Sequence, residues 1–147
     1  VVVGRAISGG FLCHGLQADR ILALGPEYGT MVHVMPLTSI ARVTKVPLKQ
    51  LEELAEANPV FAAGVPFFYR LGGVDQLVGQ PSEMRPAVLS QVTEIRRLKA
   101  EGAWEQLGPV GRGRSGWERG GRLTRQKVLE RLEQEGNGLL DEFGRTT

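Results

Sequence analysis

Glycine is the feature of this sequence that most constrains its fold. Twenty of the 147 residues are glycine and eight are proline, and this glycine share is about twice the usual one. Each glycine inside a helix costs about 1 kcal/mol relative to alanine, and an internal proline kinks or breaks a helix. The composition therefore predicts short elements separated by turns, without a long helical bundle or coiled coil.

The rest of the composition is that of one ordinary globular domain. Hydrophobic residues make up 41% and charged residues 23% of the chain, so the sequence is not of the disordered type. Its single cysteine, Cys13, cannot form an internal disulfide, which predicts the reducing cytoplasm. Because only two histidines accompany that cysteine, we expect no structural zinc site. The sequence also has no phosphate loop, dinucleotide fingerprint or metal-binding helix motif, and we expect no metal and no cofactor. No apolar run approaches the roughly 20 residues of a membrane span, so we expect no membrane partner.

Positive charge is concentrated late in the chain. Between Arg112 and Lys127 six basic residues face only one acidic residue, Glu118, in a stretch that also holds four glycines. Arginine forks bind phosphates bidentately and an aromatic face can stack on an unpaired base. The segment could therefore bind RNA, but composition alone slightly favours a solvated loop between two helices. The candidate RNA-binding residues are Arg112, Arg114, Trp117, Arg119 and Arg122.

Short apolar runs and turn residues predict an α+β fold, with strands first and helices late. Strands are expected at residues 1–3, 31–37, 41–46, 65–71 and 87–95, and helices at 48–55, 98–107 and 124–134. So many short strands predict a small, strongly bent sheet or barrel. The expected organisation is a barrel domain over 1–108 with a helical insertion near 48–58, an Arg/Gly-rich loop at 109–122, a C-terminal helix at 123–136 and a loose tail at 137–147.

The run from Met35 to Ser39 places two hydroxyl groups, those of Thr38 and Ser39, at the end of an apolar strand. At a strand end such hydroxyls can bind a phosphate or stabilise a developing charge. The alternative is a turn in which they bond their own backbone.

Two segments resemble the MazF/PemK family of toxin endoribonucleases. The Met-Pro-Leu-Thr-Ser run resembles the strand-end motif of that family, through Pro36 and Leu37. Residues 87–95, with Gln91 in a Leu-Ser-Gln-Val core, resemble one of its later strands. Three further pairs follow in the order of the family, namely Arg97-Leu98, Leu107-Gly108 and Leu123-Thr124.

This resemblance implies an SH3-like barrel with short helices, which forms a homodimer and pairs with an antitoxin protein. It implies cleavage of single-stranded RNA without a metal. Thr38 matches the catalytic threonine of the family, and Ser39 is its neighbour. The catalytic arginine of the family would fall before Val1, so Arg5 is the nearest substitute.

Two other functions remain open. The first is a non-catalytic binding or assembly module on the same barrel, such as a structural or adaptor protein of a phage or plasmid. The missing arginine and the glycine-rich loops favour it. The second is nucleic-acid binding without cleavage, through the segment from Arg112 to Lys127.

Overall fold

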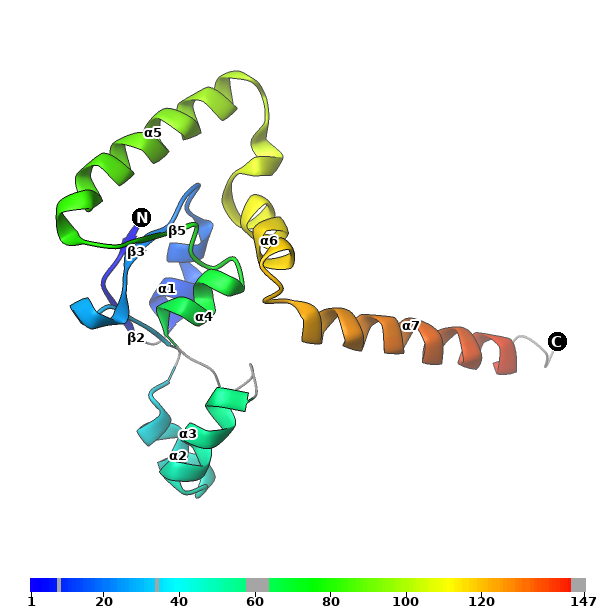
Figure 1. Ribbon diagram of the computed structural model, residues 1–147. Coiled ribbons are helices and arrows are strands. Elements are labelled where there is room, and N and C mark those ends of the chain that lie inside the picture. The colour runs from blue at the N-terminus through cyan, green and yellow to red at the C-terminus, as the bar shows by residue number, and fades with distance from the viewer. Residues whose placement is uncertain (8, 34, 58–63, 144–147) are drawn as a thin grey trace.

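A computed structural model of the chain describes residues 1–7, 9–33, 35–57 and 64–143 (Figure 1). In these ranges helices predominate, and short parallel strands form two small sheets. The strands are β1 (Val2–Val3), β2 (Arg5–Ile7), β3 (Leu22–Leu24), β4 (Met31–His33) and β5 (Gln76–Val78). The α-helices are α1 (Gly9–Cys13), α2 (Leu37–Thr44), α3 (Leu48–Ala57), α4 (Val65–Arg70), α5 (Met84–Ala100), α6 (Gly108–Glu118) and α7 (Leu123–Phe143).

The two sheets lie at the centre of the molecule. One sheet has the order β1-β3-β5, and the other pairs β2 with β4; all of these pairs are parallel. Parallel neighbours need long crossover connections, and here helices supply them. The strands are apolar because their side chains enter a shared core. That core is formed by Val3, Ile21, Ala23, Val32, Val65 and Val74.

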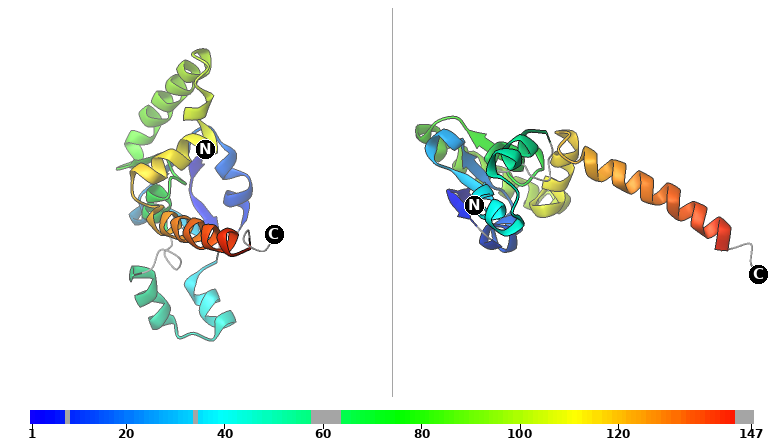
Figure 2. Two further views of the ribbon diagram at one scale, coloured as in Figure 1. Left: turned by 90° about the vertical axis from the view of Figure 1, so that its right-hand side faces the viewer. Right: turned by 90° about the horizontal axis from the view of Figure 1, so that it is seen from below.

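The helices surround the sheets unevenly (Figures 1 and 2). Helices α2 and α3 form a hairpin that hangs from one side of the body, while α5 and α6 lie on another side. Helix α7 projects away from the body as a single arm. Short 3-10 turns connect several elements: η1 (Gly15–Gln17), η2 (Pro26–Tyr28), η3 (Pro81–Glu83) and η4 (Trp104–Gln106).

The expected barrel is wrong, since the described residues form open parallel sheets and no closed barrel. The expected strands at 41–46, 65–71 and 87–95 fall within, or largely within, α2, α4 and α5. Residues 87–95 show the reason. Val88, Val92 and Ile95 are β-branched, which favours strands, but their spacing of four and three residues places them on one face of a helix.

The expectation of short elements, drawn from glycine, fails for helices α5 and α7. The segment expected as a loop at 109–122 is largely helix α6, and α5 and α7 contain 17 and 21 residues. Glycines in α6 allow a close approach to the turn after α4. A Cβ atom on Gly116 would collide with the carbonyl of Leu71, and one on Gly72 with the carbonyl of Arg112. Gly72 also has φ +79°, a conformation that favours glycine.

Helix α7 begins where the sequence predicts a C-terminal helix and continues to Phe143, through part of the expected tail. Residues 144–147 of that tail, and residue 58 of the expected insertion, lie outside the described residues. Over the residues described, no helix is both long enough and apolar enough to cross a membrane.

Candidate functional site

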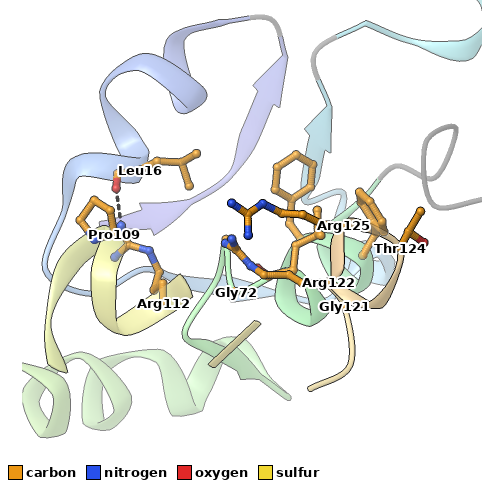
Figure 3. Close-up of a pocket in the computed structure, with 12 residues that line it drawn as sticks. Leu16, Gly72, Pro109, Arg112, Gly121, Arg122, Thr124 and Arg125 are labelled. Carbon is orange, nitrogen blue, oxygen red and sulfur yellow. Dashed lines mark hydrogen bonds between the residues drawn. The ribbon is translucent and has the colours of Figure 1, made fainter. Parts of the chain in front are cut away.

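A groove of about 410 Å³ lies between α4, the turn that follows it, and the start of α7 (Figure 3). Its apolar walls come from Leu16, Phe67, Phe68 and Leu71. Three guanidinium groups, those of Arg112, Arg122 and Arg125, also line it. This volume falls in the range of small-ligand sites, which combine apolar walls with a few polar groups.

Arg122 and Arg125 bring positive charge to this groove from the start of α7 (Figure 3). The Nε of Arg122 donates a hydrogen bond to the carbonyl oxygen of Leu71 at 3.1 Å. This contact holds the guanidinium beside the turn, and its terminal nitrogens have no hydrogen-bond partner among the described residues. The guanidinium of Arg125 lies 5.9 Å from the centre of the Trp117 ring. Both guanidinium groups can therefore bind an anion in the groove.

Arg112 has a different role on the opposite wall. Only 2% of this residue is exposed, and its guanidinium donates to the carbonyls of Leu16 and Ala18 (Figure 3). Its Nη1 also lies 3.6 Å from Oδ2 of Asp75. Burial lowers the pKa of Arg112. Because its donors are occupied inside the protein, Arg112 shapes the groove instead of offering a free charge.

Asp75 is the centre of a partly buried charge cluster beside Arg112. Its Oδ2 accepts a hydrogen bond from the backbone N–H of Ile21 at 2.7 Å, and Nη1 of Arg20 lies 3.6 Å from its Oδ1. Burial raises the pKa of Asp75, although the Ile21 N–H and the arginines Arg112, Arg20 and Arg119 act in the opposite direction. Asp75 therefore joins the start of β3 to α6 through partly desolvated charges.

Arg119, directly after α6, completes this framework. Its Nη1 donates to the carbonyls of Tyr69 and Val74, both at 2.8 Å, and its Nη2 donates to the carbonyl of Asp75 at 3.0 Å. The guanidinium also stacks 3.9 Å from the centre of the Tyr69 ring. Buried carbonyls need donors, and Arg119 satisfies three of them near β5.

A second cavity of about 410 Å³ lies between α5 and α6 and is mostly polar. Arg114 lines this cavity, not the groove, and so does Gln91, whose amide donates to Oε1 of Gln76 at 3.1 Å. The candidate RNA-binding residues are thus divided. Arg112 and Arg119 support the fold, Arg114 faces the second cavity, and only Arg122 offers free donors to the groove. The Trp117 ring lies beside the guanidinium of Arg125 and does not line the groove.

The residues matched to toxin catalysis lie elsewhere. Thr38 and Ser39 are in the first turn of α2, preceded by Pro36 and Leu37, and they line none of the three cavities described here. Arg5 starts β2 and borders a third, wide hollow of about 760 Å³. The structure does not bring these side chains together. In the described ranges no three His, Cys, Asp or Glu side chains gather as a metal site.

The fold is similar to that of a chain in a Pseudomonas malonate decarboxylase hetero-tetramer solved in complex with coenzyme A, with a TM-score of 0.53 and 27% sequence identity. This similarity covers 88% of the present chain and 50% of that chain. A chain of a Pseudomonas malonate decarboxylase MdcD-MdcE hetero-dimer matches with a TM-score of 0.46 and 28% identity, over 92% of this chain and 49% of that one. The fold is thus of the class found in malonate decarboxylase subunits.

The family is defined by sequence. Residues 1–136 match the model of the malonate decarboxylase gamma subunit family, and the chain belongs to that family. It is 55% identical over 135 residues to the malonyl-S-ACP:biotin-protein carboxyltransferase MADD of Malonomonas rubra. That alignment covers 92% of this chain and 46% of the relative, so the chain spans about half the length of the proteins that it matches.

The toxin hypothesis is therefore wrong. The match to the gamma subunit family over residues 1–136 replaces the MazF/PemK resemblance and its endoribonuclease activity. The expected partners, single-stranded RNA, an antitoxin and a second copy in a homodimer, are overturned as well, because the neighbouring structure is a malonate decarboxylase hetero-tetramer. The motifs around Thr38 and Gln91 consist of common residues, and they lie in helices α2 and α5. Their order along the chain therefore does not indicate a barrel.

Sequence reasoning missed Arg125 as a groove residue and Asp75 as the centre of the partly buried charge cluster. A usable signal existed for Asp75. It follows Gly72, Gly73 and Val74 and directly precedes a strand, and a charge next to a buried strand is expected to have a partner. No comparable signal distinguishes Arg125 from the other arginines around it.

Proposed function

We propose that this chain forms part of a gamma-type subunit in an enzyme assembly that removes the carboxyl group of a malonyl thioester. The observation that carries the proposal is the family match over residues 1–136, together with 55% identity to a malonyl-S-ACP:biotin-protein carboxyltransferase. The chain spans about half of that relative, so the activity belongs to the assembled enzyme.

The groove is the proposed binding place for the thioester. Phe67, Phe68 and Leu71 offer an apolar wall for the methylene chain of the substrate. Arg122 and Arg125 offer hydrogen-bond donors to its thioester carbonyl oxygen, on which negative charge develops in the reaction. The pocket therefore has the two properties that a malonyl thioester needs, namely an apolar lining and a positive end.

In this reaction the two guanidinium groups stabilise negative charge that develops on the thioester. The carbon–carbon bond to the carboxylate breaks, and the carboxyl group passes to a ring N–H nitrogen of biotin on an acceptor protein, the acceptor that the name of the relative states. The electron pair stays on the thioester as an enolate, which takes up the proton released by the acceptor and becomes an acetyl thioester. Donors placed beside the thioester oxygen stabilise this enolate, and in a partly closed groove their effect is larger than in water.

Substitution in the assembled enzyme tests this assignment. We expect Arg122→Gln and Arg125→Gln to lower kcat/KM for a malonyl thioester by about 100-fold, the size seen when one donor to a developing oxyanion is removed. Arg85→Gln, on the exposed start of α5, is the matched control and should stay within about twofold. If both groove variants behave like this control, the groove does not hold the substrate.

A second candidate function is assembly alone, in which the chain supports other subunits without touching substrate. Large apolar side chains exposed on α5, η4 and α6 favour it, namely Leu89, Trp104 and Val110. For this function, replacing these residues by serine should release a partner subunit in native mass measurements, while the two groove variants keep full activity.

We also propose the cytoplasm as the compartment. Cys13 is exposed and forms no disulfide with the rest of the chain, and exposed thiols of this kind persist under reducing conditions. Fractionation of cells that carry a tagged chain would place the protein directly.

A further inference from the structure

Leu16, in the short turn η1, lies on the wall of the groove opposite the start of α7. Its side chain points into the groove toward the guanidinium groups of Arg122 and Arg125 (Figure 3). In the proposed function these two groups bind the thioester carbonyl oxygen. The methylene carbon of the malonyl group is two bonds from that oxygen, so it lies between the guanidinium groups and Leu16 when the substrate is bound.

The backbone of Leu16 is held from two sides. On one side the buried guanidinium of Arg112 donates to the carbonyls of Leu16 and Ala18. On the other side the ring of Phe11 lies against Gly15, so close that a Cβ atom on Gly15 would collide with it. Any retreat of this turn from the groove would therefore break two buried hydrogen bonds, whose acceptors would lose their donor.

The remaining walls of the groove are also closely packed. The ring of Phe68 makes an edge-to-face contact with the ring of Phe11, at 6.0 Å between their centres. At the floor of the groove, a Cβ atom on Gly73 would collide with Phe68, and one on Gly72 with the carbonyl of Arg112. Walls packed in this way do not move aside for an additional carbon atom at low cost.

We propose that Leu16 makes the groove specific for an unbranched malonyl thioester, and that Arg112 is the positioning residue that holds Leu16 in place. A methyl group on the central carbon of the malonyl chain would occupy the space of the Leu16 side chain. This inference rests on the proposed function of the groove and adds which acyl group the groove accepts.

The test compares malonyl-pantetheine with racemic methylmalonyl-pantetheine in the assembled enzyme. We expect Leu16→Ala to raise the ratio of kcat/KM for the methylmalonyl over the malonyl substrate by about tenfold or more, the effect of one methylene group in an apolar pocket. Leu16→Met, which conserves volume, should keep the ratio of the unmodified enzyme. Leu77→Ala is the matched control. Leu77 is 38% exposed on β5 and lines none of the three cavities, so both substrates should be unaffected.

A double-variant cycle tests the role of Arg112. Arg112→Lys keeps the positive charge, but an ammonium group lacks the planar fork that reaches two carbonyls. We expect this variant to raise the same ratio, and to raise it no further when residue 16 is already alanine, because the effect acts through that side chain. Loss of folded protein lowers the turnover of both substrates equally and does not change the ratio.

An unchanged ratio in Leu16→Ala, or an equal change in Leu77→Ala, would overturn the inference. Additive changes in the double variant would show that Arg112 acts by another route and would overturn its positioning role. If Arg122→Gln and Arg125→Gln lower kcat/KM as expected while Leu16→Ala leaves the ratio unchanged, this inference alone fails. If the unmodified enzyme turns over no malonyl thioester, the proposed function fails and the inference fails with it.

Discussion

Helices α6 and α7 follow one another along the chain, and their arginines have opposite surroundings. Arg112 in α6 and Arg119 directly after it donate to buried carbonyls of distant segments. Arg125 and Arg131 in α7 lie on an exposed arm. The comparison shows that an arginine-rich segment does not have one function. Where backbone carbonyls lack donors, arginine stabilises the fold, and where the helix leaves the body, arginine is available to a ligand or partner.

Removal of Arg112 should give the largest effect. We expect Arg112→Ala to lower the free energy of unfolding by about 3–5 kcal/mol, because Asp75 and two carbonyls lose a buried partner. Urea titration measures this loss. Arg114→Ala, an exposed position in the same helix, should cost less than about 0.5 kcal/mol. Equal losses for the two variants would remove the distinction between buried and exposed arginines.

Glycine substitution in α6 sharpens the same comparison. Gly116 packs against the backbone of Leu71, whereas no atom lies within 4 Å of a Cβ placed on Gly113. We expect Gly116→Ala to destabilise the protein by about 1–3 kcal/mol through overpacking. Gly113→Ala should stabilise it by about 1 kcal/mol through helix propensity. Thermal unfolding of both variants measures the difference, and a shift in the same direction would mean that α6 does not pack closely on this turn.

The pH dependence of stability tests the burial of Asp75. Because burial raises its pKa above the ordinary value of 3.8, the folded protein favours the neutral carboxyl. Asp75 therefore contributes to the free energy of unfolding fully below pH 3.8, the pKa of the unfolded state. This contribution is lost as the pH rises through the higher pKa of the folded state. Asp75→Asn is the reference variant. Its side chain keeps an oxygen that can accept from the Ile21 N–H, but it does not titrate.

We expect the unmodified protein to lose stability relative to Asp75→Asn as the pH rises through this range, an effect smaller than loss of Arg112. Urea titrations from about pH 3 to 7 measure it. A relative gain with rising pH would show that the three arginines outweigh burial and lower the pKa instead.

The smallest effect is expected in α7. Arg131 is 79% exposed in its side chain and pairs with Glu135 one turn later at 2.7 Å. We expect Arg131→Ala to change the free energy of unfolding by less than about 0.5 kcal/mol, because water and salt screen such pairs. Thermal unfolding at low and high salt measures it. A loss above about 1 kcal/mol would mean that α7 packs on the body and is not an exposed arm.

Local patterns predicted some elements and missed others for identifiable reasons. Leu48, Leu51 and Leu54 recur at helical spacing, and the structure has helix α3 there. Helix α4 contains Phe67, Phe68 and Tyr69, whose aromatic side chains favour strands, but packing against Phe11 and the core selects a helix. In α5, β-branched side chains suggested a strand while their spacing was helical. Where propensity and spacing disagreed, spacing was the better guide.

Part of the candidate site was visible in the sequence. The cluster of positive charge from Arg112 to Lys127 is a property of composition, and three of its members, Arg112, Arg122 and Arg125, line the groove. The apolar half of the groove comes from Phe67, Phe68 and Leu71, more than 40 positions earlier. Nothing in the local sequence indicates that these two segments meet.

The sequence by itself determined the apolar runs, the amphipathic helix faces and the density of arginine and glycine between residues 112 and 127. Only the tertiary structure decided which arginines are buried. The carbonyls that accept from Arg112 belong to residues 96 and 94 positions earlier, and a guanidinium is buried only where such groups need donors. Among the twenty glycines, Gly116 follows the same principle, because the lack of a Cβ atom there allows the distant backbone turn at Leu71 to pack against α6, whereas nothing packs at Gly113.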